Sequence, residues 1–317
     1  KGRYSYISDK IKITTGGKLL IDEGVWLAYN GLLEVDDGGE LIFNGSNSAS
    51  AVISSFDDQR SVVRNSTFLP DRHNGFCIKC GKNGTITGSY AKLYSGGLHS
   101  VVIVDGSGKE QCYDYGAIYS EGKVTLSKSL IDNDGRNGFN GILSTVDGTL
   151  YLSEVDLRSC KNAIVCGNAT LINCTINNSD YGVSAQYGDT VSIDKCNISN
   201  NTGRGVYATI NTKIYNSTLQ NNDVSVDACM DSSKKLTMYQ NNIKNSNWGI
   251  VIRNTAKIDV QFNNIAGNKK LGLQYDYSPR INVINNYWGH PSGPSAWYYY
   301  YDYYGHLQKT YQKCGDA

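Results

Sequence analysis

Acidic and basic side chains gather in one short stretch and again about one repeat further along the chain. The stretch IDNDGRNG holds Asp132, Asp134 and Arg136, and Asp156 and Arg158 occupy the matching place after it. Carboxylates are ligands that Ca²⁺ prefers, and an arginine on the same face can act as a base toward a uronate. The set would suit calcium-assisted cleavage of an acidic polysaccharide. The same residues also suit a water-exposed turn, where Asp, Asn and Gly are favoured for backbone reasons, and we favour the turn.

Aromatic side chains form a second candidate set. The sequence has 24 tyrosines and only 6 phenylalanines, so many hydroxyls are expected to stay in water. Exposed rings can stack on the C–H faces of sugars, although part of the set could instead cover an apolar end of the fold. The candidate ligand-binding rings are Trp248, Tyr275, Tyr277, Trp297, Tyr298, Tyr299, Tyr300, Tyr301, Tyr303 and Tyr304.

The other reactive residue types match no known site. Cys77 and Cys80 form a CxxC motif, but no second pair completes a zinc site, and most of the nine cysteines fall at repeat positions as small core residues. The four histidines are scattered, and no Gly-x-Ser-x-Gly, P-loop or HExxH motif occurs. We therefore expect no metal and no cofactor, with Ca²⁺ entering only under the cleavage alternative.

An eight-residue pattern returns along the chain and would position both sets. The segments ATLINCTI, ending at Ile176, and VSIDKCNI, ending at Ile198, place apolar residues at the same positions. Successive end points lie 19 to 26 residues apart, and the other matching segments end at Ile131, Leu157, Leu219, Ile243, Ile265 and Trp288. A repeat of this length indicates a solenoid, in which each coil completes its core only against its neighbours.

Each repeat contains about three short strands. Apolar and polar residues alternate before the end point, which is typical of a strand with one buried face. A second apolar position follows later, often after glycine, as at Gly182 and Gly205. Two positions before the end point we expect a ladder of small and amide side chains that bond to one another at a bend: Ser129, Val155, Cys174, Cys196, Ser217, Asn241, Asn263 and Asn286.

These features predict one all-β domain over residues 1–317, a right-handed parallel β-helix. Dividing the length by the period gives roughly 13–14 coils, and about 4.8 Å per coil gives a rod about 60 Å long. We expect small coils over 1–60, irregular coils with loops over 61–120 and regular coils over 121–294. A Tyr-rich C-terminal cap over 295–317 would cover the open strand edges.

Composition limits the partners. Lys and Arg total 30 and Asp and Glu total 29, so the concentrated positive face that nucleic acid requires is not expected. No apolar stretch is long enough to insert into a membrane. The sequence starts in what reads as a folded strand, so an export signal would lie outside it. We expect a monomer.

The end of the chain resembles a known group. NNYWGHPSGP, residues 285–294, resembles the N-x-W-G-x-x-S-G-P signature that closes the helix in bacterial surface proteins of the pectate-lyase-like superfold, and AVISSFDD, residues 51–58, is similar to their early coils. That superfold includes lyases, hydrolases, epimerases and non-catalytic adhesins, so the resemblance implies architecture and not activity. The Asn-, Lys- and Tyr-rich composition is more weakly similar to the tapirins, cell-surface proteins whose β-helical part binds cellulose.

Because no complete catalytic set is found, the sequence predicts a protein that is not an enzyme. It would be an extracellular or cell-surface adhesion protein, bacterial in origin, that binds cellulose or another plant cell-wall glucan through the aromatic residues above. A pectate-lyase-like polysaccharide lyase or hydrolase acting around Asp132, Asp134 and Arg136 is the alternative. A structural surface spacer is the third interpretation.

Overall fold

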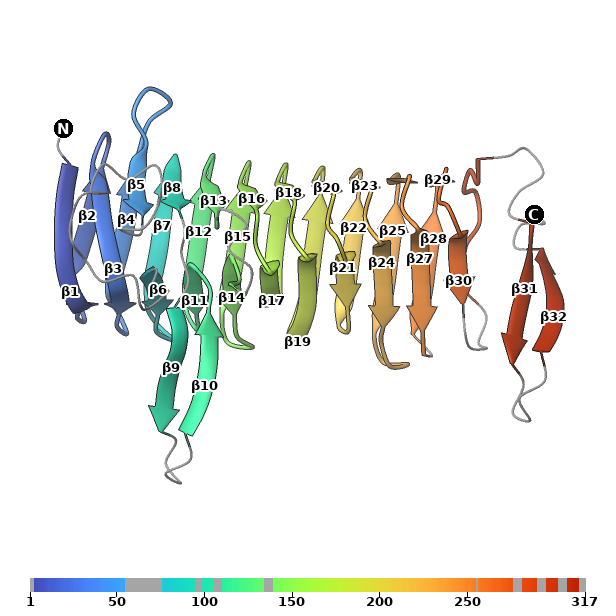
Figure 1. The fold of residues 1–317 in the computed structure, drawn as a ribbon, viewed down its shortest axis with the longest axis horizontal. Coiled ribbons are helices and arrows are strands. Elements are labelled where there is room, and N and C mark those ends of the chain that lie inside the picture. The colour runs from blue at the N-terminus through green and yellow to red at the C-terminus, as the bar shows by residue number, and fades with distance from the viewer. Residues whose placement is uncertain are drawn as a thin grey trace.

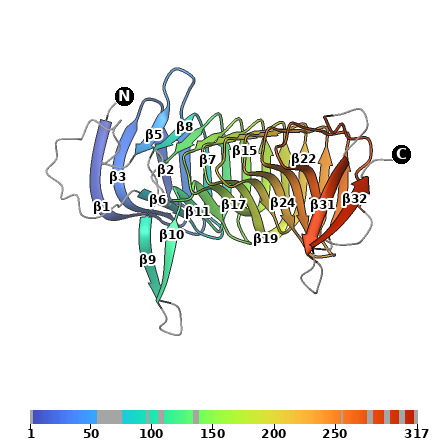
Figure 2. The same cartoon turned by 45° about the vertical axis from the view of Figure 1, so that its right-hand side comes forward.

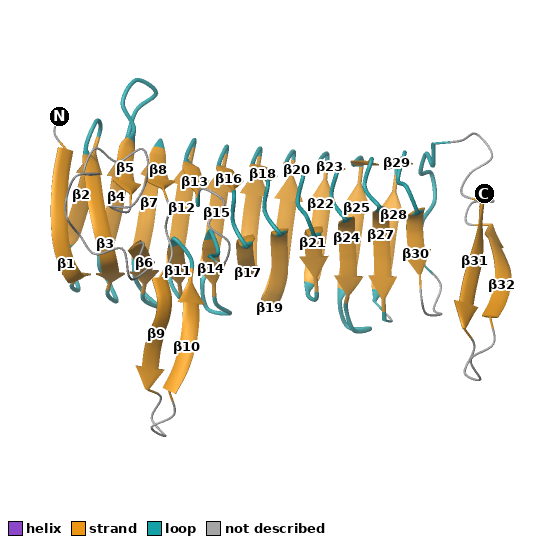
Figure 3. Ribbon diagram, in the orientation of Figure 1, coloured by secondary structure: helices purple, strands orange, loops and turns teal. Residues whose placement is uncertain are grey.

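The structure is a computed structural model that describes residues 3–54, 76–94, 98–104, 110–133, 139–254, 256–275, 281–289, 295–301 and 307–313. Strands joined by turns account for these residues, and no helix occurs in them (Figure 3). Hence none of the described segments is a helix that could cross a membrane. The all-β class predicted from the sequence is confirmed.

Twenty-eight strands wind into a rod of stacked parallel coils, with the N-terminus near one end and the C-terminus near the other (Figures 1 and 2). Each coil adds one strand to each of three faces. Face 1 contains β6 (Phe76–Cys80), β11 (Ile118–Ser120), β14 (Ile142–Ser144), β21 (Arg204–Ala208), β24 (Val224–Cys229), β27 (Trp248–Arg253) and β30 (Leu271–Tyr275).

The next two faces follow in chain order. Face 2 contains β2 (Lys18–Asp22), β4 (Glu40–Asn44), β7 (Thr85–Ser89), β12 (Lys123–Ser127), β15 (Thr149–Ser153), β22 (Asn211–Tyr215), β25 (Lys235–Tyr239) and β28 (Lys257–Gln261). Face 3 contains β5 (Ala51–Ser54), β8 (Ala91–Tyr94), β13 (Leu130–Asp132), β16 (Asp156–Arg158), β18 (Thr175–Asn177), β20 (Asn197–Ser199), β23 (Thr218–Gln220), β26 (Asn242–Lys244) and β29 (Asn264–Ala266). Four longer strands bend over a corner: β1 (Arg3–Ile13) and β3 (Trp26–Val35) join faces 3 and 1, and β17 (Asn162–Ile172) and β19 (Tyr181–Asp194) join faces 1 and 2.

Two antiparallel hairpins lie outside the winding. β9 (Leu98–Val104) and β10 (Glu110–Tyr115), which lie between β8 and β11 in the sequence, pair with each other and project from one side of the rod (Figure 1). β31 (Ser295–Tyr301) and β32 (Leu307–Lys313) pair beyond the last coil, and neither pairs with a described strand of the rod. The side chains of this second hairpin lie outside the described part of the structure, so the Tyr-rich cap stays a prediction.

The winding has fewer coils than the sequence predicted. Nine successive pairings join β2 to β28, a span of about 43 Å at the usual strand spacing. The estimate of 13–14 coils assumed that every residue belongs to a coil. The connections between β5 and β6 and between β8 and β11, and the C-terminal hairpin, are each about as long as a full repeat, which lowers the number of coils.

The interior consists of columns of apolar residues, as the repeat predicted. Ile176 lies in register with Leu157 on one side and with Ile198 on the other. The same column continues through Leu219 and Ile243 to Ile265, and each of these side chains is at most 1% exposed. Because strands of successive coils pair in register, one apolar position per repeat builds a continuous core along the rod.

Two ladders of polar side chains run along the two corners that flank face 3. At the corner between faces 2 and 3, the main-chain N–H of Asn241 donates to Oδ1 of Asn263 at 2.9 Å, and that of Asn263 donates to Oδ1 of Asn286 at 2.9 Å. The predicted ladder is confirmed. A second ladder, which the sequence analysis missed, lies between faces 3 and 1, where the N–H of Asn201 donates to Oδ1 of Asn222 at 3.0 Å.

We expect the substitution Asn263→Ala to lower the free energy of unfolding by about 3 kcal/mol, because it removes the acceptor of a buried N–H and leaves a cavity. The urea midpoint measures this loss. The matched control is Asn264→Ala, one residue away on an exposed position, which should change stability by less than about 0.5 kcal/mol. Equal losses in the two variants would show that the ladder is not a main source of stability.

Candidate functional site

The predicted acidic cluster assembles on the outer surface of face 3. β13 and β16 pair in register, so Asp132 lies beside Arg158, and Leu130 lies beside Asp156. Nε of Arg158 donates to Oδ2 of Asp132 at 2.9 Å, and its NH1 lies 3.6 Å from Oδ2 of Asp156. The sequence correctly predicted that these two coils meet. Asp134 and Arg136 lie outside the described residues.

Burial sets the electrostatics of this cluster. It raises the pKa of Asp156 above the ordinary value of 3.8, Arg158 opposes that change, and Asp132 adds to it. Burial, together with the charge of Asp132, also raises the pKa of the Cys160 thiol to about 12, so this thiol stays protonated at neutral pH. The arginine is engaged by two carboxylates of its own protein. It is therefore less available to a ligand than an arginine with free N–H groups.

Metal-ligating side chains do not cluster in the part of the chain that the structure describes. The described residues contain no group of three or more His, Cys, Asp or Glu side chains placed to hold a metal ion. Cys77 and Cys80 of the CxxC motif point to opposite sides of β6, since Cys80 belongs to the core and Cys77 packs outside it with Leu32 and Tyr119. We therefore derive no chemistry through a bound metal.

A second charged cluster lies on the outer surface of face 1 and was missed by the sequence analysis. Asp227 on β24 is completely buried, and two arginines from different coils pair with it. Nε of Arg204, on β21, donates to Oδ2 at 2.5 Å, and Nε of Arg253, on β27, donates to Oδ1 at 2.9 Å. The side chains of the two arginines remain 30% and 48% exposed, so their other N–H groups can reach a ligand.

Two tyrosines complete this cluster, which we call the Arg–Asp–Arg cluster. NH1 of Arg204 donates to the hydroxyl oxygen of Tyr181 at 2.8 Å. The guanidinium carbon of Arg204 lies 5.2 Å from the ring centre of Tyr181 and 4.9 Å from that of Tyr207, so the arginine is held by both rings. Burial raises the pKa of Tyr207, and the neighbouring Cys229 and Asp227 raise it further. Tyr207 therefore keeps its proton at neutral pH.

The local fold explains why these side chains point outward. Gly205 faces the interior so closely that an added Cβ would lie 2.6 Å from the carbonyl oxygen of Ser225 in the next coil. The next residue, Val206, is also buried in the core. With two consecutive residues turned inward, Arg204 and Tyr207 on either side of them point outward. Placing RGVYAT over VSVDAC and WGIVIR in the sequence reproduces this register.

The predicted aromatic residues divide into three groups. Trp248 lies in register with Val224, which pairs with Arg204, so it shares the face of the Arg–Asp–Arg cluster, and Nζ of Lys270 lies 4.9 Å from its ring centre. Tyr275 pairs with Ile252 and packs, partly buried, against the core, and its ligand-binding role stays a prediction. Side-chain positions lie outside the described residues for Tyr277, Trp297, Tyr298, Tyr299, Tyr300, Tyr301, Tyr303 and Tyr304.

Comparison with known proteins agrees with this architecture. The family of the right-handed β-helix region matches residues 99–225 and 162–303. The chain belongs to this right-handed β-helix family. Its membership confirms the predicted right-handed parallel β-helix fold. No curated protein sequence matches the chain significantly.

Solved structures of similar fold come from a carbohydrate-active enzyme. The periplasmic alginate epimerase AlgG aligns with 90% of this chain and 78% of its own, at 11% identity and a TM-score of 0.50. A single-residue mutant of AlgG aligns over the same shares at 12% identity and a TM-score of 0.57. At this identity the likeness shows the β-helix fold.

These neighbours correct one prediction. The sequence analysis predicted a β-helix protein that is not an enzyme, whereas the structural neighbours are polysaccharide-processing enzymes. The prediction failed because it looked for catalytic motifs along the sequence. A β-helix instead assembles side chains from successive coils, such as Arg204, Asp227 and Arg253, which are more than 20 residues apart.

We expect Asp156→Asn to make this β-helix protein more stable at pH 7. The folded state holds the Asp156 proton more tightly than the unfolded chain does, so stability falls as the pH rises from about 3.8 through the raised pKa. The variant should not show that fall, and its advantage should vanish near pH 3, where both states are protonated. Thermal unfolding across pH measures the difference. Asp189→Asn, at an exposed position, is the control for the loss of one carboxylate from the surface.

Proposed function

We propose that the chain is an enzyme that acts on a polysaccharide bearing carboxylate groups, with its active site at the Arg–Asp–Arg cluster on face 1. The observation that carries the proposal is the completely buried carboxylate of Asp227, with a partly exposed guanidinium group on each side. Polysaccharide-acting β-helix proteins such as the alginate epimerase support it.

The arginines suit a carboxylate substrate. Asp227 engages only the Nε edge of Arg204 and of Arg253, which fixes the planes of both groups. Two positive charges stand against one negative charge, so the cluster can accept a further anion. Guanidinium groups bind carboxylates through two parallel hydrogen bonds. By neutralising a uronate carboxylate, they would stabilise the negative charge that develops when the adjacent carbon loses its proton.

The tyrosines suit the proton transfers. The hydroxyl oxygen of Tyr181 lies 2.8 Å from NH1 of Arg204, beside the guanidinium group that would bind the substrate carboxylate, so Tyr181 is the candidate base. Tyr207 keeps its proton, so it is the candidate acid. Removal of the proton next to the carboxylate is the shared first step of β-elimination and of epimerisation. The proposal therefore keeps the lyase alternative from the sequence and moves its site from face 3 to face 1.

The remaining sequence-based predictions concern the polysaccharide that is bound and the location of the protein. Cellulose carries no carboxylate, so this geometry favours an acidic polymer, and binding to cellulose stays a prediction. Trp248 can still offer a sugar-stacking ring beside the cluster. The named periplasmic location of AlgG is compatible with an extracellular or cell-surface location for this chain. The bacterial origin, the monomeric state, the adhesive and spacer roles and the tapirin resemblance stay predictions.

We expect Arg253→Gln to reduce kcat/KM on an acidic polysaccharide about 100-fold or more, because one charged donor to the developing negative charge is lost. Wild-type protein is incubated with polygalacturonate and with alginate. Absorbance of unsaturated ends reports elimination, and NMR of the sugar protons reports epimerisation. Tyr207→Phe should lower kcat more than it changes KM.

The matched control is Lys213→Gln, which removes an exposed cation from face 2 and should leave the rate unchanged. A wild-type protein that changes neither polymer while being retained on insoluble cellulose would overturn the proposal. Equal activity of wild type and Arg253→Gln would remove the cluster from the mechanism. Circular dichroism confirms that each variant is folded.

A further inference from the structure

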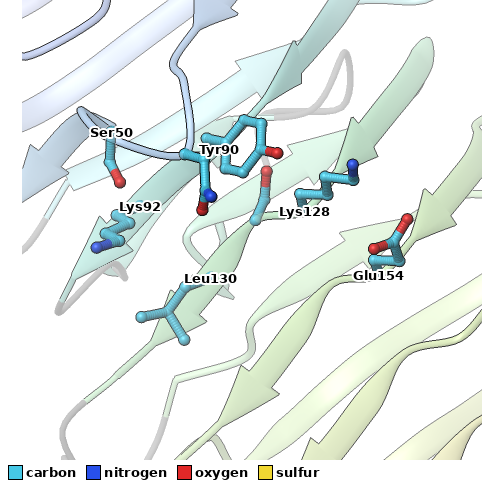
Figure 4. A pocket seen from close by; sticks show the side chains of 8 residues that line it. Ser50, Tyr90, Lys92, Lys128, Leu130 and Glu154 are labelled. Atoms are coloured by element: carbon cyan, nitrogen blue, oxygen red, sulfur yellow. The ribbon is translucent and has the colours of Figure 1, made fainter.

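A groove of about 450 Å³ lies at the corner between faces 2 and 3, away from the Arg–Asp–Arg cluster. Side chains from three successive coils surround it, together with the turn before β5 (Figure 4). Its lining includes Ser50, Tyr90, Lys92, Lys128, Leu130 and Glu154. The volume lies within the range of small-ligand sites, and the residues that line it are mostly polar.

Three of the lining residues adopt a backbone conformation that their side chains disfavour. Tyr90, Lys128 and Glu154 have φ angles of 51°, 48° and 56°, in the left-handed region. At the corner between faces 3 and 1, asparagines such as Asn200 and Asn221 occupy the equivalent turn, and asparagine adopts this conformation more readily. Lys195, Gln240 and Phe262 adopt the same conformation at this corner outside the groove, so the conformation belongs to the corner, and at the groove it brings three long side chains into one lining.

The groove also contains positive charge without a carboxylate partner. Neither Lys92 nor Lys128 forms an ion pair with any described residue, and Nζ of Lys128 lies 5.7 Å from the ring centre of Tyr90. Glu154 is the carboxylate in the lining, and Asp156 beyond Leu130 is turned toward Arg158. Two lysines, an aromatic ring and polar side chains in the lining of one groove match the chemistry of a sugar that carries an anionic group.

We propose that this groove binds an acidic saccharide at a site separate from the one on face 1. Lys92 and Lys128 hold its carboxylate or sulfate groups. The ring of Tyr90 contacts the apolar side of a sugar, and Ser50 and Glu154 bond to sugar hydroxyls. Binding here requires no turnover, so it can be measured whether or not the cluster on face 1 is active.

The test is isothermal titration with oligogalacturonate, a sulfated oligosaccharide, cello-oligosaccharide and inorganic phosphate. To isolate the groove from the cluster on face 1, the parent protein and every variant carry Arg253→Gln. The double variant Lys92→Gln and Lys128→Gln is expected to weaken binding of the acidic oligosaccharide at least tenfold. Glutamine fits the left-handed turn, since Gln240 has a φ of 56° at the same corner.

The matched control is Lys195→Gln, which removes a lysine with a φ of 55° from the same corner outside the groove. It should leave the affinity within twofold of the parent. A preference for the uronate or for the sulfated sugar identifies the anionic group. The proposal is overturned if the double variant binds as tightly as the parent, if Lys195→Gln weakens binding equally, or if phosphate or the neutral sugar binds as well as the acidic ones.

Discussion

The rod depends on giving buried main-chain amides at its corners a hydrogen-bond acceptor in the next coil. Many of the described turns at the two corners that flank face 3 pass through the left-handed region, as at Asn200, Asn221 and Gln240. Side chains such as Asn201, Asn222, Asn241 and Asn263 accept these bonds one coil at a time. The ladders therefore fix the rise and the register from coil to coil, and the apolar columns pack within that register.

The fixed register between coils also positions side chains on the outer surface of the rod. Once an inward position is set in one coil, the outward positions of neighbouring strands stack at a constant spacing. Arg204, Asp227 and Arg253 come from three coils and still meet within hydrogen-bond distance. A completely buried carboxylate would destabilise the fold if it were unpaired, so its two arginines serve stability as well as ligand binding. Both guanidinium side chains stay partly exposed, which suits the acidic polymer that we propose as the substrate.

Faces 1 and 3 show how different two charged clusters on one fold can be. On face 3, Arg158 is shared by Asp132 and Asp156, which leaves the cluster with more negative than positive charge. On face 1 the ratio is reversed, and two aromatic rings hold one of the cations. Negative excess repels an acidic substrate and positive excess attracts it. The sign of the excess charge, and not the number of charged residues, distinguishes the acidic cluster on face 3 from the candidate active site on face 1.

The sequence alone determined the fold class, the inward columns and one ladder, because a parallel solenoid repeats each buried position at a readable interval. The sequence also predicted that Asp132 lies beside Arg158, because each of them directly follows the end point of its repeat, Ile131 or Leu157. It overestimated the coils, because the chain leaves the winding at β9–β10 and at other long connections. Only the tertiary structure revealed the Arg–Asp–Arg cluster. Outward residues carry no repeating pattern in the sequence. At Gly205 and Val206 two consecutive residues face the interior, which breaks the alternation of inward and outward side chains. Which outward side chains contact one another is therefore decided by how the coils stack.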